Sequence, residues 1–149
     1  MKKIKNLVFL MLLAVVSIFG ISKVSAAGWK TYLNLPYGVV HSGSIRSFGT
    51  GTHRIMISVD GFNTSAGTLR TSGSTTMAIA LMDPLTGHEL NYDVSNYTYG
   101  TCLNNIMGSF SSGPKYYSFF SRIYNFSTGV YEYYDGVKAD EVYMYPLPS

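Results

Sequence analysis

The chain has 149 residues, of which 46% are hydrophobic, 15% aromatic and 13% charged, with a formal net charge of +3. The Lys and Arg residues after position 27 are scattered singly, whereas phosphate recognition requires basic residues in clusters. The composition therefore argues against a nucleic-acid partner and fits one globular domain.

Residues 1–26 have the pattern of a secretory signal peptide, because three lysines precede an apolar run over positions 7–21. Small residues at Ser25 and Ala26 predict cleavage after Ala26. A membrane anchor is the alternative, but the run is shorter than the roughly 20 residues that a spanning helix needs. Loss of four lysines with the leader leaves seven basic and eight acidic residues, a net charge of −1. We expect a secreted, extracellular protein without a membrane span in its mature chain.

The remaining residues 27–149 are predicted to form a single domain. Cys102 is the one cysteine and has no partner for an internal disulfide. We expect it to be buried as a small apolar residue, with pairing to another chain as the alternative. A lysine-rich leader and a cysteine-poor mature chain are typical of a bacterial secretory protein.

Short alternating runs recur about every ten residues along the mature chain, and helical periodicity is hard to find. In 75–83, Met77, Ile79 and Leu81 face one way while Ala78 and Ala80 face the other. The predicted strands, in chain order, cover 29–33, 44–48, 52–60, 69–71, 75–83, 105–110, 115–126, 130–134 and 141–145. Their short connections require antiparallel pairing. The sequence predicts an all-β fold, an antiparallel β-sandwich of about eight strands, either jelly-roll or immunoglobulin-like.

Two turns are explicit in the sequence. In "DPLTG", Asp83 begins a turn that Gly87 closes in a left-handed conformation. Asp135 and Gly136 form the pair most typical of a two-residue hairpin loop, so the strand before it is predicted to pair with the strand after it.

Local signatures of catalysis are absent from the sequence. His41, His53 and His88 match no zinc-binding spacing, so His53 is interpreted as a packing residue and His88 as a turn residue. Asp60, Asp83 and Asp135 are interpreted as turn formers, with calcium binding as a minor alternative and otherwise no cofactor. The sequence therefore predicts no catalytic residue and argues against an enzyme, although a hydrolase with a non-local site stays open.

Aromatic residues offer the one functional hypothesis. Most are interpreted as sheet packing, and six are assigned to the core: Trp29, Phe48, Phe62, Phe110, Phe119 and Phe126. In the predicted hairpin, Tyr131 and Tyr133 share a face with Lys138 and Asp140, and burial of those charges would be costly. This face is therefore expected to be exposed and, with the C-terminal tyrosines, to form a ligand-binding strip of Tyr131, Tyr133, Lys138, Tyr143 and Tyr145.

Two classes of function follow from this interpretation. The first is a secreted, non-catalytic binding module whose aromatic strip contacts an extracellular carbohydrate, cell-wall polymer or surface protein. The second is a secreted toxin-like or antagonistic effector. The sequence does not indicate an oligomeric state.

Overall fold

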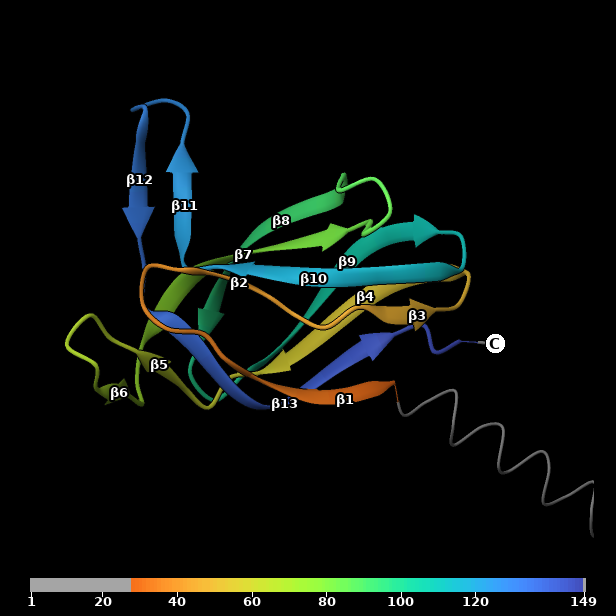
Figure 1. The fold of residues 1–149 in the computed structure, drawn as a ribbon. Helices are drawn as coiled ribbons and strands as arrows, with labels where there is room; N and C mark the ends of the chain where they lie inside the picture. The colour runs from red at the N-terminus through yellow and green to blue at the C-terminus, as the bar shows by residue number, and fades with distance from the viewer. Residues whose placement is uncertain (1–27, 149) are drawn as a thin grey trace, which may run out of the picture.

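Two antiparallel sheets face each other in the computed structural model, which describes residues 28–148 (Figure 1). The predicted signal peptide lies outside the described residues. The first sheet contains six strands: β1 (Trp29–Asn34), β4 (Gly51–Ser58), β5 (Gly61–Asn63), β6 (Leu69–Arg70), β9 (Cys102–Phe110) and β13 (Gly136–Tyr145). The second contains five: β2 (Val40–Ser42), β3 (Arg46–Phe48), β7 (Ser74–Met82), β8 (Glu89–Thr98) and β10 (Gly113–Phe120).

The order of the strands identifies the topology as a jelly roll. For this comparison, β2 and β3 count as one strand, and the short strands β5 and β6 are left out. The hairpin over residues 122–133, described below, is also left out, so eight principal strands remain. One sheet then has the order first, eighth, third and sixth, with β13 between β1 and β4. The other has the order second, seventh, fourth and fifth. The predicted antiparallel β-sandwich is confirmed, in its jelly-roll form.

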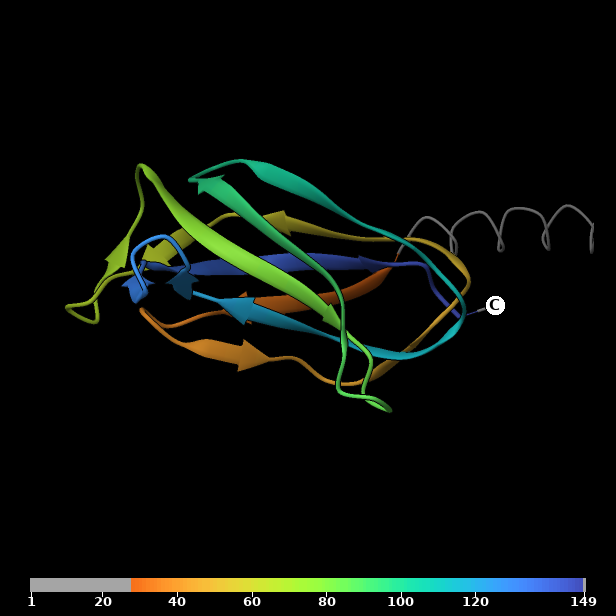
Figure 2. The same ribbon diagram turned by 90° about the horizontal axis from the view of Figure 1, so that it is seen from above.

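A third element, the hairpin of β11 (Arg122–Asn125) and β12 (Val130–Tyr133), pairs with neither sheet. In Figure 1 it projects from one end of the sandwich, and in Figure 2 it is seen nearly end on. It follows β10 after a single residue, so its position is set by the end of that strand.

The inward faces of the two sheets form one apolar core. Alternation along the strands places one face of each inward, as β4 shows with Ile55 and Ile57 fully buried between more exposed neighbours. Burial of this face drives the pairing of the sheets. The predicted core aromatics Phe48, Phe62 and Phe119 are buried, and Trp29 and Phe110 pack against the core while partly exposed.

The predicted hairpin at Asp135 and Gly136 is wrong. β12 pairs with β11, with Tyr131 opposite Tyr124, whereas β13 pairs with β1, β4 and β5. Gly136 is needed for a different reason, because a Cβ at this position would overlap the carbonyl oxygens of Leu35 and Pro36. The glycine therefore permits a close approach between backbones and does not serve a turn.

Asp135 holds the base of the β6–β7 loop instead of forming a turn. Its carboxylate accepts hydrogen bonds from Arg70 Nη2 at 2.8 Å and Nε at 3.1 Å, and its carbonyl accepts one from Thr75 Oγ1 at 2.8 Å. The interpretation of Asp135 as a turn former is therefore also wrong.

Other local predictions had mixed outcomes. Asp83 accepts a hydrogen bond from Leu85 N at 2.8 Å and Gly87 has φ of 69°, which confirms that turn. Asp60 instead accepts a hydrogen bond from Asp140 N at 2.6 Å, which joins the short β4–β5 connection to β13. Cys102 is exposed, so its predicted burial is wrong. Residues 28–148 include no helix long and apolar enough to cross a membrane.

Candidate functional site

The base of the hairpin is fixed by Ser121, a fully buried residue between β10 and β11. Its hydroxyl donates to the carbonyl of Pro36 at 2.7 Å and accepts a hydrogen bond from Val39 N at 2.9 Å. Its backbone N donates to the Val39 carbonyl at 2.9 Å, and its carbonyl accepts from Tyr134 N at 2.8 Å. Because Ser121 forms hydrogen bonds with two other segments, the β1–β2 connection at Pro36 and Val39 and the end of the hairpin at Tyr134, the direction in which the hairpin leaves the sandwich is well defined.

The tip of the hairpin is a four-residue loop over positions 126–129. Asn125 Oδ1 accepts hydrogen bonds from Ser127 N at 2.9 Å and Thr128 N at 3.3 Å. Gly129 closes the loop with φ of 72°, and its N donates to the Asn125 carbonyl at 2.8 Å. An Asn side chain that bonds its own backbone and a glycine at positive φ are the usual chemistry of such a loop.

Three aromatic rings cluster on the hairpin. The Tyr124 ring centroid lies 4.9 Å from that of Phe126 and 5.2 Å from that of Tyr131, both in edge-to-face geometry. The Arg122 guanidinium carbon lies 5.0 Å from the centroid of the Tyr131 ring. Phe126 is 90% exposed and Tyr131 51% exposed, so these rings support one another while their outer surfaces face solvent. The prediction that Phe126 belongs to the core is wrong.

The neighbouring sheet supplies two further rings. Tyr92 on β8 and Phe120 on β10 meet across β7, with ring centroids 5.8 Å apart and an edge-to-face angle of 74°. Between them, Ala78 pairs with Phe120 and Ala80 pairs with Tyr92. Because the alanine side chains are small, the two rings have room to approach over β7. The alternation predicted for β7, with large residues inward and alanines outward, therefore allows the Tyr92 and Phe120 rings to meet on the outer face of this sheet.

Hairpin and sheet together enclose an open cleft of about 600 Å³. This size is within the range of small-molecule sites. We call it the aromatic cleft, and it is lined by Val40, Glu89, Tyr92, Val94, Phe120, Arg122, Ile123, Tyr124, Phe126 and Tyr131.

Two charged groups give the aromatic cleft its polar character. Glu89 and Arg122 lie in the lining, and within residues 28–148 neither of them forms an ion pair. The Nε atom of Arg122 is buried and has no hydrogen-bond partner among the described residues. Burial raises the pKa of Tyr92, with a further contribution from the charge of Glu89, so its hydroxyl stays protonated and can donate. An apolar cleft with a few directed polar groups is typical of ligand sites.

On the other face of the hairpin, Glu132 is engaged structurally. Its carboxylate accepts hydrogen bonds from Tyr134 at 2.6 Å and Asn125 at 2.8 Å. These two hydrogen bonds, first from Tyr134 and then from Asn125, lower the pKa of Glu132. The polar face of the hairpin is therefore occupied by internal contacts, whereas the aromatic face is open.

The five predicted binding residues do not form one strip. Tyr131 lies in the aromatic cleft, but Tyr133, although 52% exposed, stacks on Tyr37 with ring centroids 6.4 Å apart. Lys138 lies on β13, with Nζ 3.8 Å from the Asp140 carboxylate. The predicted exposure of Tyr131 and Tyr133 is confirmed, although the reasoning through a β12–β13 hairpin was wrong.

Tyr143 and Tyr145 lie on the large sheet, near the end of β13, away from the projecting hairpin (Figure 1). Lys30 Nζ lies 5.8 Å from the Tyr143 ring centroid, and the Arg54 guanidinium carbon lies 4.5 Å from the Tyr145 centroid. These rings therefore cover the outer face of the large sheet. The structure does not bring them together with Tyr131.

His53 and His88 lie where the sequence indicates, one in the core and one in a turn. His53 is fully buried between the rings of Phe48 and Phe110, each with its centroid 5.5 Å away, and its Nδ1 lies 2.9 Å from the Gly51 carbonyl. His88 lies in the turn after Asp83, where its carbonyl accepts from Asp83 N at 2.9 Å. Across positions 28–148, no three His, Cys, Asp or Glu residues converge to hold a metal ion.

Sequence reasoning missed most of the aromatic cleft. It treated residues 115–126 as one strand, which placed Phe120, Arg122 and Tyr124 on a common sheet face, and it did not predict β8. The signal that locates the hairpin is "NFSTG", in which an Asn precedes a four-residue loop and a Gly ends it, between alternating runs. The hairpin rings come together with Tyr92 only because β8 pairs with β7, and no local pattern in the sequence predicts that pairing.

No protein-family model and no curated protein sequence matches the chain. Among solved structures, the chain is similar to the CBM36-1 domain of a multidomain xylanase from the hindgut metagenome of Trinervitermes trinervoides. The two share 11% sequence identity with a TM-score of 0.40, and the match covers 80% of this chain and 78% of that one.

Proposed function

We propose that this protein is a secreted, non-catalytic binding module that takes a carbohydrate in the aromatic cleft. The observation that carries the proposal is the convergence of five aromatic rings, from two sheet strands and the hairpin, around one open space of about 600 Å³. Secretion is supported by the N-terminal sequence alone.

The chemistry of the lining suits a sugar. The faces of aromatic rings carry partial negative charge, and the axial C–H groups of a pyranose present a complementary apolar surface. Tyr124, Tyr131 and Phe126 expose such surfaces, while Arg122, Glu89 and the Tyr92 hydroxyl can bond sugar hydroxyls at the rim. Tyrosine provides this contact area at a small cost in side-chain entropy.

The support of the hairpin also favours recognition. A surface that is rigid before binding loses less entropy when the ligand arrives. Ser121 anchors the base, Asn125 and Gly129 fix the tip, and the ring contacts of Tyr124 hold the face. The aromatic side chains are therefore preorganised although they are exposed.

Binding is better supported than hydrolysis. Most glycoside hydrolases use two carboxyl groups on either side of the scissile bond. The lining of the aromatic cleft contains one carboxylate, that of Glu89. Substrate turnover at this cleft would need a second acid from outside the lining.

The proposal is tested by glycan-array screening, followed by calorimetry with each glycan that binds. Tyr124→Ala and Tyr131→Ala should each weaken affinity at least about tenfold, as expected for aromatic residues at the centre of a binding surface. The matched control is Tyr99→Ala, because Tyr99 is exposed at the β8–β9 turn and does not line the aromatic cleft. Unchanged affinity in both cleft variants, or equal loss in the control, would reject the proposal.

A further inference from the structure

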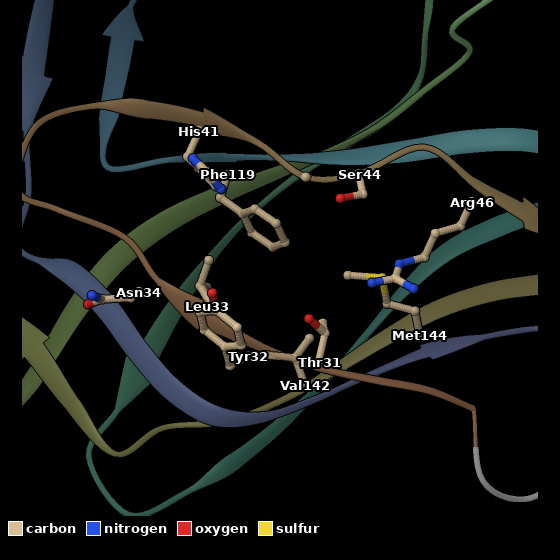
Figure 3. Close-up of a pocket in the computed structure, with 11 residues that line it drawn as sticks. Thr31, Tyr32, Leu33, Asn34, His41, Ser44, Arg46, Phe119, Val142 and Met144 are labelled. Carbon is tan, nitrogen blue, oxygen red and sulfur yellow. The ribbon is translucent and has the colours of Figure 1, made fainter.

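A second concave site lies on the open side of the sandwich, between β1 of one sheet and the β2–β3 segment of the other (Figure 3). Its volume is about 450 Å³. Its floor is apolar and is formed by Leu33, Phe119, Val142 and Met144. Because β1 pairs with β13 alone and β2 with β10 alone among the described strands, the groove follows an edge of the sandwich where neither sheet continues, although the residues of its floor are themselves buried. We call it the edge groove.

The walls of the edge groove carry polar groups on both sides. Figure 3 shows His41, Ser44 and Arg46 along the β2–β3 wall, with Thr31 and Tyr32 opposite on β1. Asn34 lies at the far end of the β1 wall, where its side chain points away from the groove and its Oδ1 accepts a hydrogen bond from Asn63 Nδ2 at 2.9 Å. The lining therefore offers hydroxyl and imidazole groups together with one guanidinium, and it contains no Asp or Glu.

Positive charge at this edge is poorly balanced. Arg46 pairs with Lys115 across β3 and β10, so two cations stand directly opposite in an antiparallel register. Neither side chain forms an ion pair with a carboxylate among residues 28–148. Arg46 is therefore a cation in the groove lining that no carboxylate of the described residues neutralises.

Lys115 and Arg46 differ in how their charges are accommodated. Lys115 is buried, and its Nζ donates to the Ser111 carbonyl at 2.6 Å. Burial lowers the pKa of Lys115, and the negative charge of Asp83 opposes that shift. The Arg46 guanidinium carbon instead lies 5.4 Å from the centroid of the Trp29 ring, and its side chain extends into the groove (Figure 3). A cation–π contact holds a guanidinium in place while leaving its N–H groups free to donate.

We propose that the edge groove is a second binding site, which takes a sugar bearing a carboxylate, of the uronate class. The carboxylate would be held by Arg46, whose forked donors match its two oxygens. The sugar hydroxyls would meet Thr31 and Ser44, and the sugar ring would lie over the apolar floor. A uronate combines these three features in a single unit.

The edge groove is separate from the aromatic cleft. On β2, Val40 lines the aromatic cleft and His41 lines the edge groove. On β10, Phe120 lines the aromatic cleft and Phe119 lines the edge groove. Successive residues of a strand point to opposite faces, so the two sites lie on opposite sides of the β2–β10 pair. This inference therefore does not depend on the function proposed for the aromatic cleft.

The test is an NMR titration of the purified protein with galacturonate and with glucuronate. Galactose, glucose and acetate at equal concentrations serve as comparisons. We expect amide shifts at Thr31, Ser44 and Arg46 with at least one uronate, and weaker binding of the matching neutral sugar by about tenfold or more. Equal binding of the neutral sugar, or no shift at the groove with either uronate, would overturn the proposal. Equal binding of acetate would overturn the assignment to a sugar.

Variants assign the binding to its residues. Arg46→Gln should weaken uronate affinity at least about tenfold, whereas Arg54→Gln should not change it. Arg54 is the matched control because its guanidinium also stacks on an aromatic ring, that of Tyr145, but it does not line the groove. Ser44→Ala, an exposed substitution, provides a second test if Arg46→Gln fails to fold. Tyr131→Ala should keep full uronate affinity, and loss of uronate binding in this variant would place the uronate in the aromatic cleft instead.

Discussion

The same residue types occupy two opposite environments in this protein. In the sandwich, the side chains of Tyr97 and Tyr117 are almost completely buried, and burial strongly raises the pKa of each. In the β11–β12 hairpin, Tyr124 and Tyr131 remain exposed and contact mainly one another, Phe126 and Arg122. Aromatic content therefore does not distinguish core from surface here. What distinguishes them is whether a second sheet covers the strand.

The largest expected effect concerns the sandwich. Phe48 is buried against His53 and Tyr117, with ring centroids 5.5 Å and 6.1 Å away. Phe48→Ala should lower the free energy of unfolding by about 3–5 kcal/mol, because it leaves a cavity in the core. Urea denaturation followed by tryptophan fluorescence measures this change. A loss below about 1 kcal/mol would show that the packing around Phe48 is not as described.

A smaller effect is expected where the two regions meet. Ser121→Ala removes the hydroxyl that serves Pro36 and Val39, and should cost about 1–3 kcal/mol of stability. Hydrogen exchange should also become faster at the Tyr134 amide, which bonds the Ser121 carbonyl. Ser47→Ala, at an exposed position of β3, is the control and should change neither quantity. Normal exchange at Tyr134 in Ser121→Ala would mean that the hairpin base is held by other contacts.

The buried histidine should make the sandwich sensitive to acid. Burial lowers the pKa of His53, the hydrogen bond with the Gly51 carbonyl opposes the shift, and the charge of Lys115 lowers the pKa further. The unfolded chain, with a pKa near 6.5, therefore binds the proton more readily than the folded chain. Stability is fully present above about pH 6.5 and falls as the pH drops through the lowered pKa of the folded state.

Denaturation curves between pH 7.5 and 5 test whether the free energy of unfolding falls as the pH is lowered. His53→Gln cannot titrate and should flatten the dependence, although its overall stability will be lower. His88→Asn, at an exposed turn position, should keep the dependence of the original protein. An unchanged slope in His53→Gln would assign the acid sensitivity to another group.

The smallest effect on stability is expected at the hairpin. Phe126→Ala should change the free energy of unfolding by less than about 0.5 kcal/mol, because the side chain is 90% exposed. The same substitution should weaken glycan binding, since Phe126 lines the aromatic cleft. A large loss of stability without loss of binding would show that Phe126 has a structural role and not a binding role.

The sandwich could be predicted because its strands carry the signal themselves. In β4, Ile55 and Ile57 are buried on either side of the partly exposed Met56. In β7, Met77, Ile79 and Leu81 alternate with two small alanines, and their large side chains form one inward face. β8 escaped prediction because its sequence is rich in Asn, Asp and Ser, which are uncommon in strands. β2 and β5, with three residues each, also carry too little pattern to be recognised, so the structure contains more strands than the sequence predicts.

The aromatic cleft was harder to predict because it depends on a break in one strand and on non-local pairing. Continuing the alternation through Ser121 puts Tyr124 on a sheet face, whereas the strand ends at this serine, which forms hydrogen bonds with Pro36, Val39 and Tyr134. The prediction at Asp135–Gly136 was wrong because of another non-local contact. Gly136 is required because any side chain there would overlap the backbone of Leu35, a residue 101 positions earlier in the chain.

The most direct test of the account is an NMR titration of the protein with a glycan that binds on the array. The account predicts chemical-shift changes concentrated at Tyr92, Arg122, Tyr124, Phe126 and Tyr131, with the buried Tyr97 and Tyr117 unaffected. Changes confined to the outer face of the large sheet, around Tyr143 and Tyr145, would contradict it.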